Sequence, residues 1–190
     1  MPLSNSALLV MDVQQGVVQR FGSKLESLEP FQRAIGAARA AGVPVIFVRV
    51  AFRDGYPEVS PRNKRFSTIS AREGMKRDDA STQIHPLIAP RPDEIVVTKL
   101  RVSAFAGSDL EVVLRAKQVE TLVLTGIATS GVVLSTVREA ADKDFRLVVL
   151  SDACVDADAE VQRVLIEKVF PRQAEVTTVE AWAESLMEQA

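Results

Sequence analysis

The chain has very few of the side chains that build disulfides and metal sites, with one cysteine and one histidine among 190 residues. A single cysteine excludes an internal disulfide framework and is typical of a protein kept in a reducing cytoplasm. One cysteine and one histidine also exclude a Cys/His zinc site, which needs several such ligands. An all-carboxylate metal site is not excluded, but no cluster of acidic residues marks one. We therefore expect a cytoplasmic protein without a bound metal or other cofactor.

Net charge and long apolar stretches are equally scarce. A formal charge of −2 gives no electrostatic reason to expect nucleic acid or an anionic membrane as a partner. No apolar run approaches the roughly 18 residues of a membrane span, and the first residues show no basic segment followed by an apolar one, so no secretory leader is predicted. The composition, 47% hydrophobic and 25% charged, favours one globular domain over residues 1–190.

Short apolar runs alternate with helical patterns along the chain. A continuous apolar run is typical of a strand buried on both faces, and strands that alternate with helices indicate right-handed crossovers. The predicted strands are 7–11, 43–50, 95–98, 121–124, 145–150 and 174–178. The predicted helices are 30–41, 109–116, 131–143, one from a cap at Asp158 to a stop at Pro171, and a terminal helix with Trp182 and Leu186. The sequence thus predicts an α/β fold, a three-layer α/β/α, Rossmann-like domain with a mostly parallel sheet of about six strands.

Residues 51 to about 80 lose this periodicity and collect glycine, proline, arginine, asparagine and aspartate. A stretch of this length without regular structure is usually a lid, a binding loop or a subunit contact. Its polar residues Arg53, Tyr56, Asn63 and Arg65 are candidates for contact with a substrate or with a neighbouring subunit. The sequence does not decide between these two roles.

Two charged residues end predicted strands: Asp12 follows the first and Lys99 the third. The segment from Thr125 to Thr136 follows the fourth strand and turns into a helix, whose start offers unpaired N–H groups to an anion and has Ser130 as a possible cap. Carboxyl ends of parallel strands share one edge of the sheet, so the three features converge if the first and fourth strands are neighbours. An Asp–Lys pair there serves either proton transfer or strand-end structure.

Four motifs in order carry a resemblance to a known family. They are Leu-Leu-Val-Met-Asp-Val-Gln at 8–14, Lys99 with Ser-Ala-Phe at 103–105, Thr-Gly-Ile-Ala-Thr at 125–129 continued by Val-Leu-Ser-Thr at 133–136, and Asp-Ala at 152–153. With these motifs at these separations, the chain resembles the isochorismatase-like hydrolases, which include isochorismatases, nicotinamidases and N-carbamoylsarcosine amidohydrolases. The resemblance extends almost from end to end.

The resemblance implies roles for individual residues. Asp12 would be the catalytic acid or base and Lys99 its electrostatic partner. The peptide bond between Ile127 and Ala128 would be cis, and the N–H groups of Ala128 and Val132 would face a developing oxyanion. The residues placed on the substrate side are Gln14, Phe105, Ala128 and Thr129.

One position departs from the amidase branch of the family. That branch has a nucleophilic cysteine in the turn, and its place falls on Val132, which has no ionisable atom. The nicotinamidase metal motif is also missing, since residues 51–66 contain no histidine. Isochorismatases proper lack the cysteine too, usually with glycine there, and they hydrolyse a vinyl ether with a proton donor and a water. Valine in place of that glycine would narrow the pocket.

Three functional hypotheses follow. The first is a hydrolase without a cysteine nucleophile that acts on a small, carboxylate-bearing molecule. The second is a non-catalytic member that keeps the pocket for ligand binding or assembly. The third is an amidase that uses Cys154, and Ser130 is a further nucleophile candidate, whereas His85 lacks the partners of a catalytic triad. Family members are commonly dimers or larger, so the resemblance implies a homodimer or higher homo-oligomer, with residues 51–80 as a candidate contact.

Overall fold

The computed structural model describes residues 5–22 and 27–188, so the start of the chain, where no leader is predicted, lies outside it. The described residues form one six-stranded sheet with all strands parallel, in the order β3-β2-β1-β4-β5-β6. Its strands are β1 (Ser6–Met11), β2 (Val45–Val50), β3 (Ile95–Lys99), β4 (Thr121–Ile127), β5 (Arg146–Val155) and β6 (Glu175–Thr177). The predicted α/β fold and parallel sheet are confirmed.

The sheet reverses its strand order between β1 and β4. The two strands are hydrogen-bonded neighbours, and Met11 lies opposite Gly126 at their carboxyl ends. A Cβ atom on Gly126 would come within 2.6 Å of the Met11 carbonyl oxygen, so only glycine allows the strands to approach this closely. In open α/β sheets such a reversal leaves a crevice outside the strand ends, where ligands bind.

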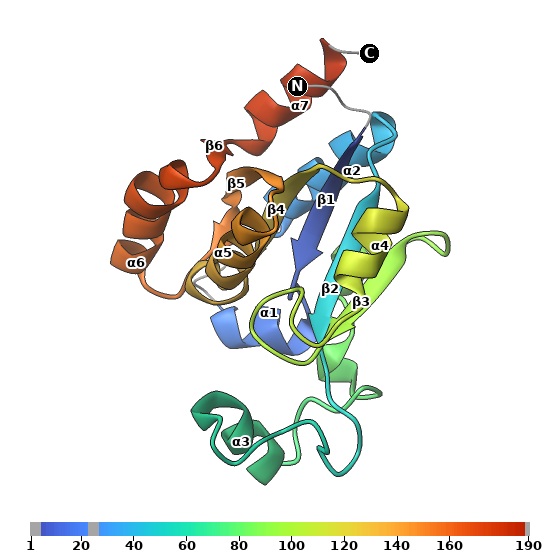
Figure 1. The fold of residues 1–190 in the computed structure, drawn as a ribbon, viewed down its shortest axis with the longest axis vertical. Coiled ribbons are helices and arrows are strands. Elements are labelled where there is room, and N and C mark those ends of the chain that lie inside the picture. The colour runs from blue at the N-terminus through green and yellow to red at the C-terminus, as the bar shows by residue number, and fades with distance from the viewer. Residues whose placement is uncertain (1–4, 23–26, 189–190) are drawn as a thin grey trace.

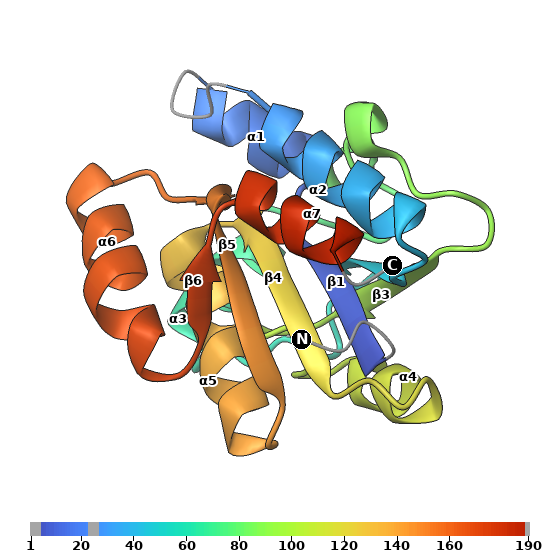
Figure 2. The ribbon, with the colours of Figure 1, turned by 90° about the horizontal axis from the view of Figure 1, so that it is seen from above.

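Helices cover both faces of the sheet (Figure 2). One face packs against α1 (Gln15–Phe21), α2 (Glu29–Ala40) and α7 (Val179–Met187), with Phe31, Phe47 and Trp182 in the shared core. The other packs against α4 (Leu110–Ala116), α5 (Leu134–Asp142) and the turns η6 (Leu165–Val169) and η7 (Phe170–Arg172). The helix α6 (Ala159–Val164) leads into η6 and has no buried residue of its own. Within the described ranges, no helix is long and apolar enough to cross a membrane.

The fifth strand is longer than predicted. We expected it to end at residue 150, but β5 continues to Val155, and its register against β4 shifts between Leu124 and Gly126. This irregularity carries the chain past Asp152, whose Oδ1 accepts a hydrogen bond of 2.8 Å from the N–H of Val179. The polar residues at 151–152 were misleading as a strand end because they do not open a loop: Ser151 donates to the Thr177 carbonyl oxygen of β6, and Asp152 accepts from the N–H of Val179 at the start of α7.

The segment 51–80 is not irregular throughout, which corrects the sequence prediction. It contains α3 (Lys64–Ala71), and two short turns, η3 (Ala80–Thr82) and η4 (Pro86–Ile88), come at and after its end. Asn63 caps α3 by accepting a hydrogen bond of 3.1 Å from the Phe66 N–H. Phe66 packs edge-on against Phe52 with ring centroids 5.4 Å apart. In Figure 1, α3 lies beyond the carboxyl ends of β1 and β2, over the crevice.

Candidate active site

Asp12 and Lys99 meet at the carboxyl edge of the sheet. Asp12 directly follows β1 with φ at 58°, a left-handed conformation that aspartate and asparagine tolerate better than most residues. Lys99 ends β3, which is separated from β1 by β2, and its long side chain brings Nζ to 2.7 Å from Asp12 Oδ2. The two residues are only 8% and 1% exposed, so this is a buried ion pair.

The surroundings of the pair favour proton transfer. Burial raises the pKa of Asp12 above its ordinary value, although the positive charge of Lys99 opposes the shift. Burial likewise lowers the pKa of Lys99, whose Nζ also donates to the Val102 carbonyl oxygen at 2.6 Å. The second carboxyl oxygen, Asp12 Oδ1, is buried and has no hydrogen-bond partner among the described residues. Asp12 therefore has one oxygen held by Lys99 and one left for a ligand.

The turn after β4 forms the opposite wall. The peptide bond between Ile127 and Ala128 is cis, as the resemblance implies, and the helix opens with a π-helical turn, η5 (Thr129–Val133). Ser130 does not cap it through its side chain. Instead, its backbone N–H donates to the Asp156 carboxylate at 2.7 Å. One N–H of this helix start is therefore already occupied by an anion of the protein itself.

Two adjoining spaces open beside the ion pair. The smaller, about 30 Å³, is walled by Asp12, Lys99 and Val132 together with residues of the loop after β3. The larger, about 390 Å³, extends from Asp12 and Ala128 towards α1 and α3. A space of about 30 Å³ is enough for a single water molecule. Val132, only 2% exposed, thus bounds a water-sized chamber next to the Asp12 carboxyl.

The four residues that the resemblance placed on the substrate side do not all line these spaces. Ala128 lines both spaces, whereas Gln14, Phe105 and Thr129 line neither. Gln14 is fully buried and bonds to the backbone of Val50 through both its Nε2 and its Oε1, and to the Thr82 carbonyl through Nε2. These bonds tie the end of β2 to the η3 turn, so Gln14 shapes the crevice from behind.

Phe105 and Thr129, the other two residues that line neither space, are buried in the core. Phe105 is stacked on Phe145 with centroids 6.0 Å apart, under the ammonium of Lys143 at 5.6 Å. Thr129 is buried, and its Oγ1 has no hydrogen-bond partner among the described residues.

The structure separates the four polar candidates of segment 51–80. Arg65 lines both spaces beside Asp12 and makes no ion pair or side-chain hydrogen bond with the described residues. The other three serve their own segment: Arg53 approaches Glu58 at 3.6 Å, Tyr56 donates to the Gly74 carbonyl, and Asn63 caps α3. Arg65 is thus the cation of this segment that faces the site.

Sequence reasoning missed Arg101, which roofs the smaller space. Its guanidinium donates to the carbonyl oxygens of Leu100 and Glu58 at 2.6 and 2.8 Å and lies 5.9 Å from the centre of the Phe66 ring. These contacts fasten the loop after β3 to the 51–80 segment. No local pattern marks Arg101, because Glu58 and Phe66, which hold it over this space, are distant in sequence.

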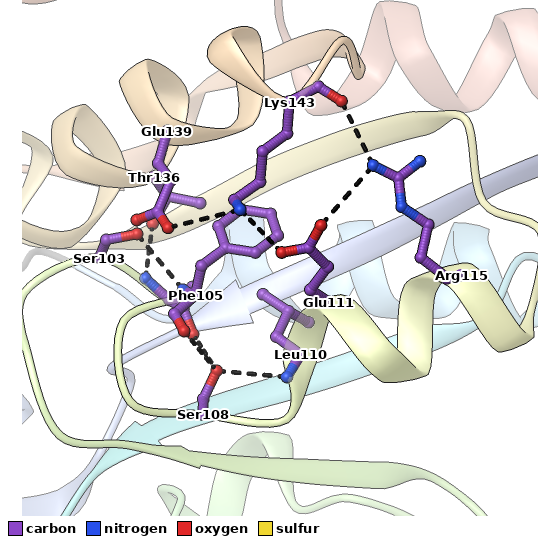
Figure 3. A network of polar contacts seen from close by, with 10 residues as sticks. Ser103, Phe105, Ser108, Leu110, Glu111, Arg115, Thr136, Glu139 and Lys143 are labelled. Carbon is purple, nitrogen blue, oxygen red and sulfur yellow. Dashed lines mark hydrogen bonds and ion pairs between the residues drawn. The ribbon is translucent and has the colours of Figure 1, made fainter.

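A polar network holds that same loop against the opposite side of the site (Figure 3). Thr136, fully buried on α5, accepts a hydrogen bond of 3.0 Å from the N–H of Ala104. Ser108 donates to the carbonyl oxygens of Ala104 and Phe105, and Lys143, directly after α5, pairs with Glu111 of α4 at 2.7 Å. Thr136 lies one helical turn after Val132, so this bond couples the turn after β4 to the loop that begins at Lys99.

Replacing Thr136 by valine is expected to destabilise the fold by about 1–3 kcal/mol, because the buried N–H of Ala104 loses its acceptor while side-chain volume is kept. Urea denaturation would measure the change in the free energy of unfolding. Thr136→Ser keeps the hydroxyl and serves as the control, with a smaller loss. Equal stability of Thr136→Val and the wild type would show that this bond contributes nothing.

Cys154 and His85 do not join the site. Cys154 lies within β5, is 3% exposed, and burial raises the pKa of its thiol to about 12. It is a small buried hydrophobe rather than a nucleophile. His85 caps η4 by accepting a hydrogen bond from the Leu87 N–H. In residues 5–22 and 27–188, no group of three His, Cys, Asp or Glu side chains comes together that could hold a metal ion.

The chain is similar to known proteins over almost its whole length. Residues 6–181 match the isochorismatase domain family. The chain is 35% identical over 179 residues to the uncharacterized isochorismatase family protein YecD of Escherichia coli O157:H7, covering 92% of this chain and 93% of that protein. It is 32% identical over 208 residues to the ureidoacrylate amidohydrolase RutB of Stutzerimonas stutzeri, covering 97% and 84%.

The fold is also shared with solved structures. A cysteine hydrolase from Pseudomonas syringae pv. phaseolicola superposes with a TM-score of 0.90 at 26% identity, covering 100% of this chain and 96% of that one. An isochorismatase family protein from Burkholderia thailandensis gives a TM-score of 0.77 at 29% identity, covering 97% and 96%. With a family match over nearly the whole chain, close relatives and this shared architecture, the protein belongs to the isochorismatase family.

Proposed function

We propose that the protein is a hydrolase of this family that works without a cysteine nucleophile on a small, carboxylate-bearing enol ether. Asp12 is the general acid, Lys99 its electrostatic partner, and a water in the chamber beside Val132 is the nucleophile. The observation that carries the proposal is the state of the Asp12 carboxyl: it is buried, its pKa is raised, and its Oδ1 has no hydrogen-bond partner within residues 5–22 and 27–188.

The reaction follows from this arrangement. Asp12 donates its proton to the terminal carbon of the enol ether, which places positive charge on the ether carbon. Water attacks that carbon and returns a proton to Asp12. The resulting hemiketal loses the alcohol and leaves a ketone, so one water is consumed for each ether bond broken. Lys99 and Arg65 supply the positive charge that holds the substrate carboxylate.

Val132 favours water as the nucleophile over a covalent route. Its side chain has no nucleophilic atom, and the space that it bounds is water-sized. The backbone N–H of Ala128, beside the same space, is a donor for negative charge that survives any change of side chain. Amide hydrolysis by a thiolate, the chemistry of a cysteine hydrolase, has no side chain to perform it here.

Turnover of a substrate panel tests this proposal. We expect consumption of isochorismate and related enol ethers, and no hydrolysis of ureidoacrylate or N-carbamoylsarcosine, on which named relatives of this chain act. Hydrolysis of the two ureido compounds would contradict a route without a nucleophilic side chain.

A non-catalytic role is the second candidate, because Val132 fills the place where the resemblance puts a nucleophile. In that case no compound of the panel is consumed, while small carboxylates still raise the melting temperature by binding near Asp12 and Lys99. Consumption of any enol ether in proportion to protein concentration would exclude this role.

The pH profile of turnover should carry a base limb set by Asp12. Since the protonated acid is the active form and burial raises its pKa above the ordinary 3.8, activity is lost as pH rises through that raised value.

The positive charge of Arg65 lowers the pKa of Asp12. Arg65→Gln should therefore move the base limb to higher pH and raise KM about three- to tenfold, the effect of one exposed, salt-screened charge.

Arg62→Gln is the matched control, since Arg62 is an exposed arginine of the same segment that does not line the crevice. It should leave both KM and the pH profile unchanged. Equal effects of the two substitutions would mean that Arg65 acts only through the general charge of the segment.

A further inference from the structure

The larger space beside Asp12 differs from the ion-pair chamber in chemistry. Besides the residues that also line the smaller space, the larger space is lined by side chains of α1 and of the 51–80 segment. These are Val17 and Phe21 of α1, and Thr68, Ile69 and Met75 of the segment. Arg20 of α1 is the one further charged residue among the described residues. Among the residues that the structure describes, Asp12 is the only acidic one in either lining. The added side chains are thus mostly apolar, although polar and apolar atoms line the space in comparable measure, and positive charge surrounds it.

These apolar side chains are not wholly buried in the protein core. Ile69 and Met75 are partly buried against a small cluster formed by Val50, Phe52 and Phe66, and part of their surface faces the open space. On the other side, Val17 and Phe21 are partly buried against the core beneath α1. Apolar surface lining a concave space of about 390 Å³ is typical of a ligand pocket that buries the body of a small molecule.

The two spaces are continuous through shared walls. Asp12, Val50, Arg65, Phe66, Ile127 and Ala128 line both. A molecule whose charged and reactive end lies at Asp12 and Arg65 must therefore extend its remainder against Phe21, Ile69 and Met75. The chamber at Val132 holds only a water and offers the remainder no other direction.

We propose that the larger space is a binding subsite for the apolar body of the substrate, so that the substrate class is an amphiphilic carboxylate with an alkyl, cyclic or aryl body rather than a wholly polar acid. The assignment of the substrate carboxylate to Asp12 and Arg65 rests on the proposed function, whereas the apolar subsite is inferred independently of it. The 51–80 segment then sets specificity, since it supplies both the cation, Arg65, and the apolar contacts, Ile69 and Met75.

The test is a titration of the full chain with propionate, pentanoate and hexanoate, and with the three matching neutral amides, followed by NMR of methyl groups. Each added methylene should strengthen binding about fourfold until the space is full, which corresponds to about 0.8 kcal/mol. The methyl signals of Met75, Ile69 and Val17 should shift, and that of Val112, which is 71% exposed on α4, should not.

The two series separate this inference from the proposed function. Gains with chain length in both series support the apolar subsite, and preference for acids over amides supports the anion site. If chain length gives no gain, or if the shifts lie away from Met75 and Ile69, the apolar subsite is overturned, even when the acids still bind better than the amides.

Ile69→Thr provides a second measurement with little change of shape. It should weaken hexanoate about three- to tenfold while leaving propionate within twofold, because only the longer chain reaches Ile69. Ile166→Thr is the matched control, because Ile166 is a partly buried isoleucine that packs on the core at the α5 face of the sheet. It should change the affinity for neither hexanoate nor propionate. A uniform loss for both acids would show that α3 was displaced, and the wild-type chain-length series then decides.

Discussion

Replacing Asp12 by asparagine should lower kcat/KM for an enol-ether substrate by about 10²- to 10⁴-fold, the usual contribution of a positioned general acid. The amide has no acidic proton to give at any pH used for assay. Asparagine also tolerates the left-handed backbone at this position, where φ is 58°, so the local chain keeps its path.

The same substitution acts on Lys99. The negative charge of Asp12 raises the pKa of this lysine against the lowering effect of burial. Without that charge the pKa falls further, and the lysine can release its proton instead of remaining as an unpaired buried cation. The protein should therefore stay folded, which circular dichroism and a melting curve would check.

Asp152→Asn is the matched control for Asp12→Asn. Asp152 also lies near the carboxyl edge of the sheet, but it is exposed and bonds to the Val179 N–H through an oxygen that asparagine retains. Its substitution should leave kcat/KM within about twofold. A folded Asp12→Asn variant with the wild-type rate would remove Asp12 from the mechanism.

Val132→Cys should create a reactive thiol in a protein that otherwise has none. Cysteine is slightly smaller than valine and fits the same wall of the chamber that contains Asp12 and Lys99. The lysine cation and the adjacent helix start stabilise a thiolate there. Because the chamber adjoins the larger space of about 390 Å³, iodoacetamide should reach the introduced thiol from that side and label it at pH 7. The wild type stays unlabelled because Cys154 is buried with a pKa of about 12.

Val112→Cys places a thiol on an exposed position of α4 and serves as the control. Its labelling rate should rise with pH as for an ordinary thiol of pKa about 8.5, while the rate for Val132→Cys levels off at lower pH. Mass spectrometry would report both rates. Gain of amide hydrolysis by Val132→Cys would further support position 132 as the place of the family's nucleophile. A folded Val132→Cys variant that resists labelling at pH 7 would contradict that assignment.

The sheet and the ion pair could be predicted because each depends on short-range sequence. Continuous apolar runs mark strands buried on both faces, and a charge directly after such a run lands at the carboxyl edge. Asp12 follows β1 and Lys99 ends β3 in this way. That they touch across β2 depends on the length of the lysine side chain, which the pattern of residues does not measure.

The parts that were not predicted depend on contacts between distant residues. The helix α3 is short and packs on its own small cluster around Phe52 and Phe66, so it shows no long amphipathic stripe. Ser130 was expected to cap the helix with its side chain, but its backbone N–H instead donates to Asp156, 26 residues away. Arg65 was one of four candidates for contact with a substrate, and that it alone of the four lines the crevice depends on how its segment folds over the strand ends.

The central claim is that Asp12 protonates the carbon of an enol ether in a site without a nucleophilic side chain. Hydrolysis of isochorismate in D₂O, after treatment of the wild-type protein with iodoacetamide, tests it most directly. The account predicts undiminished turnover and one deuterium on the carbon that becomes the methyl group of the ketone product. Loss of turnover after alkylation, or a product without deuterium at that carbon, would contradict it.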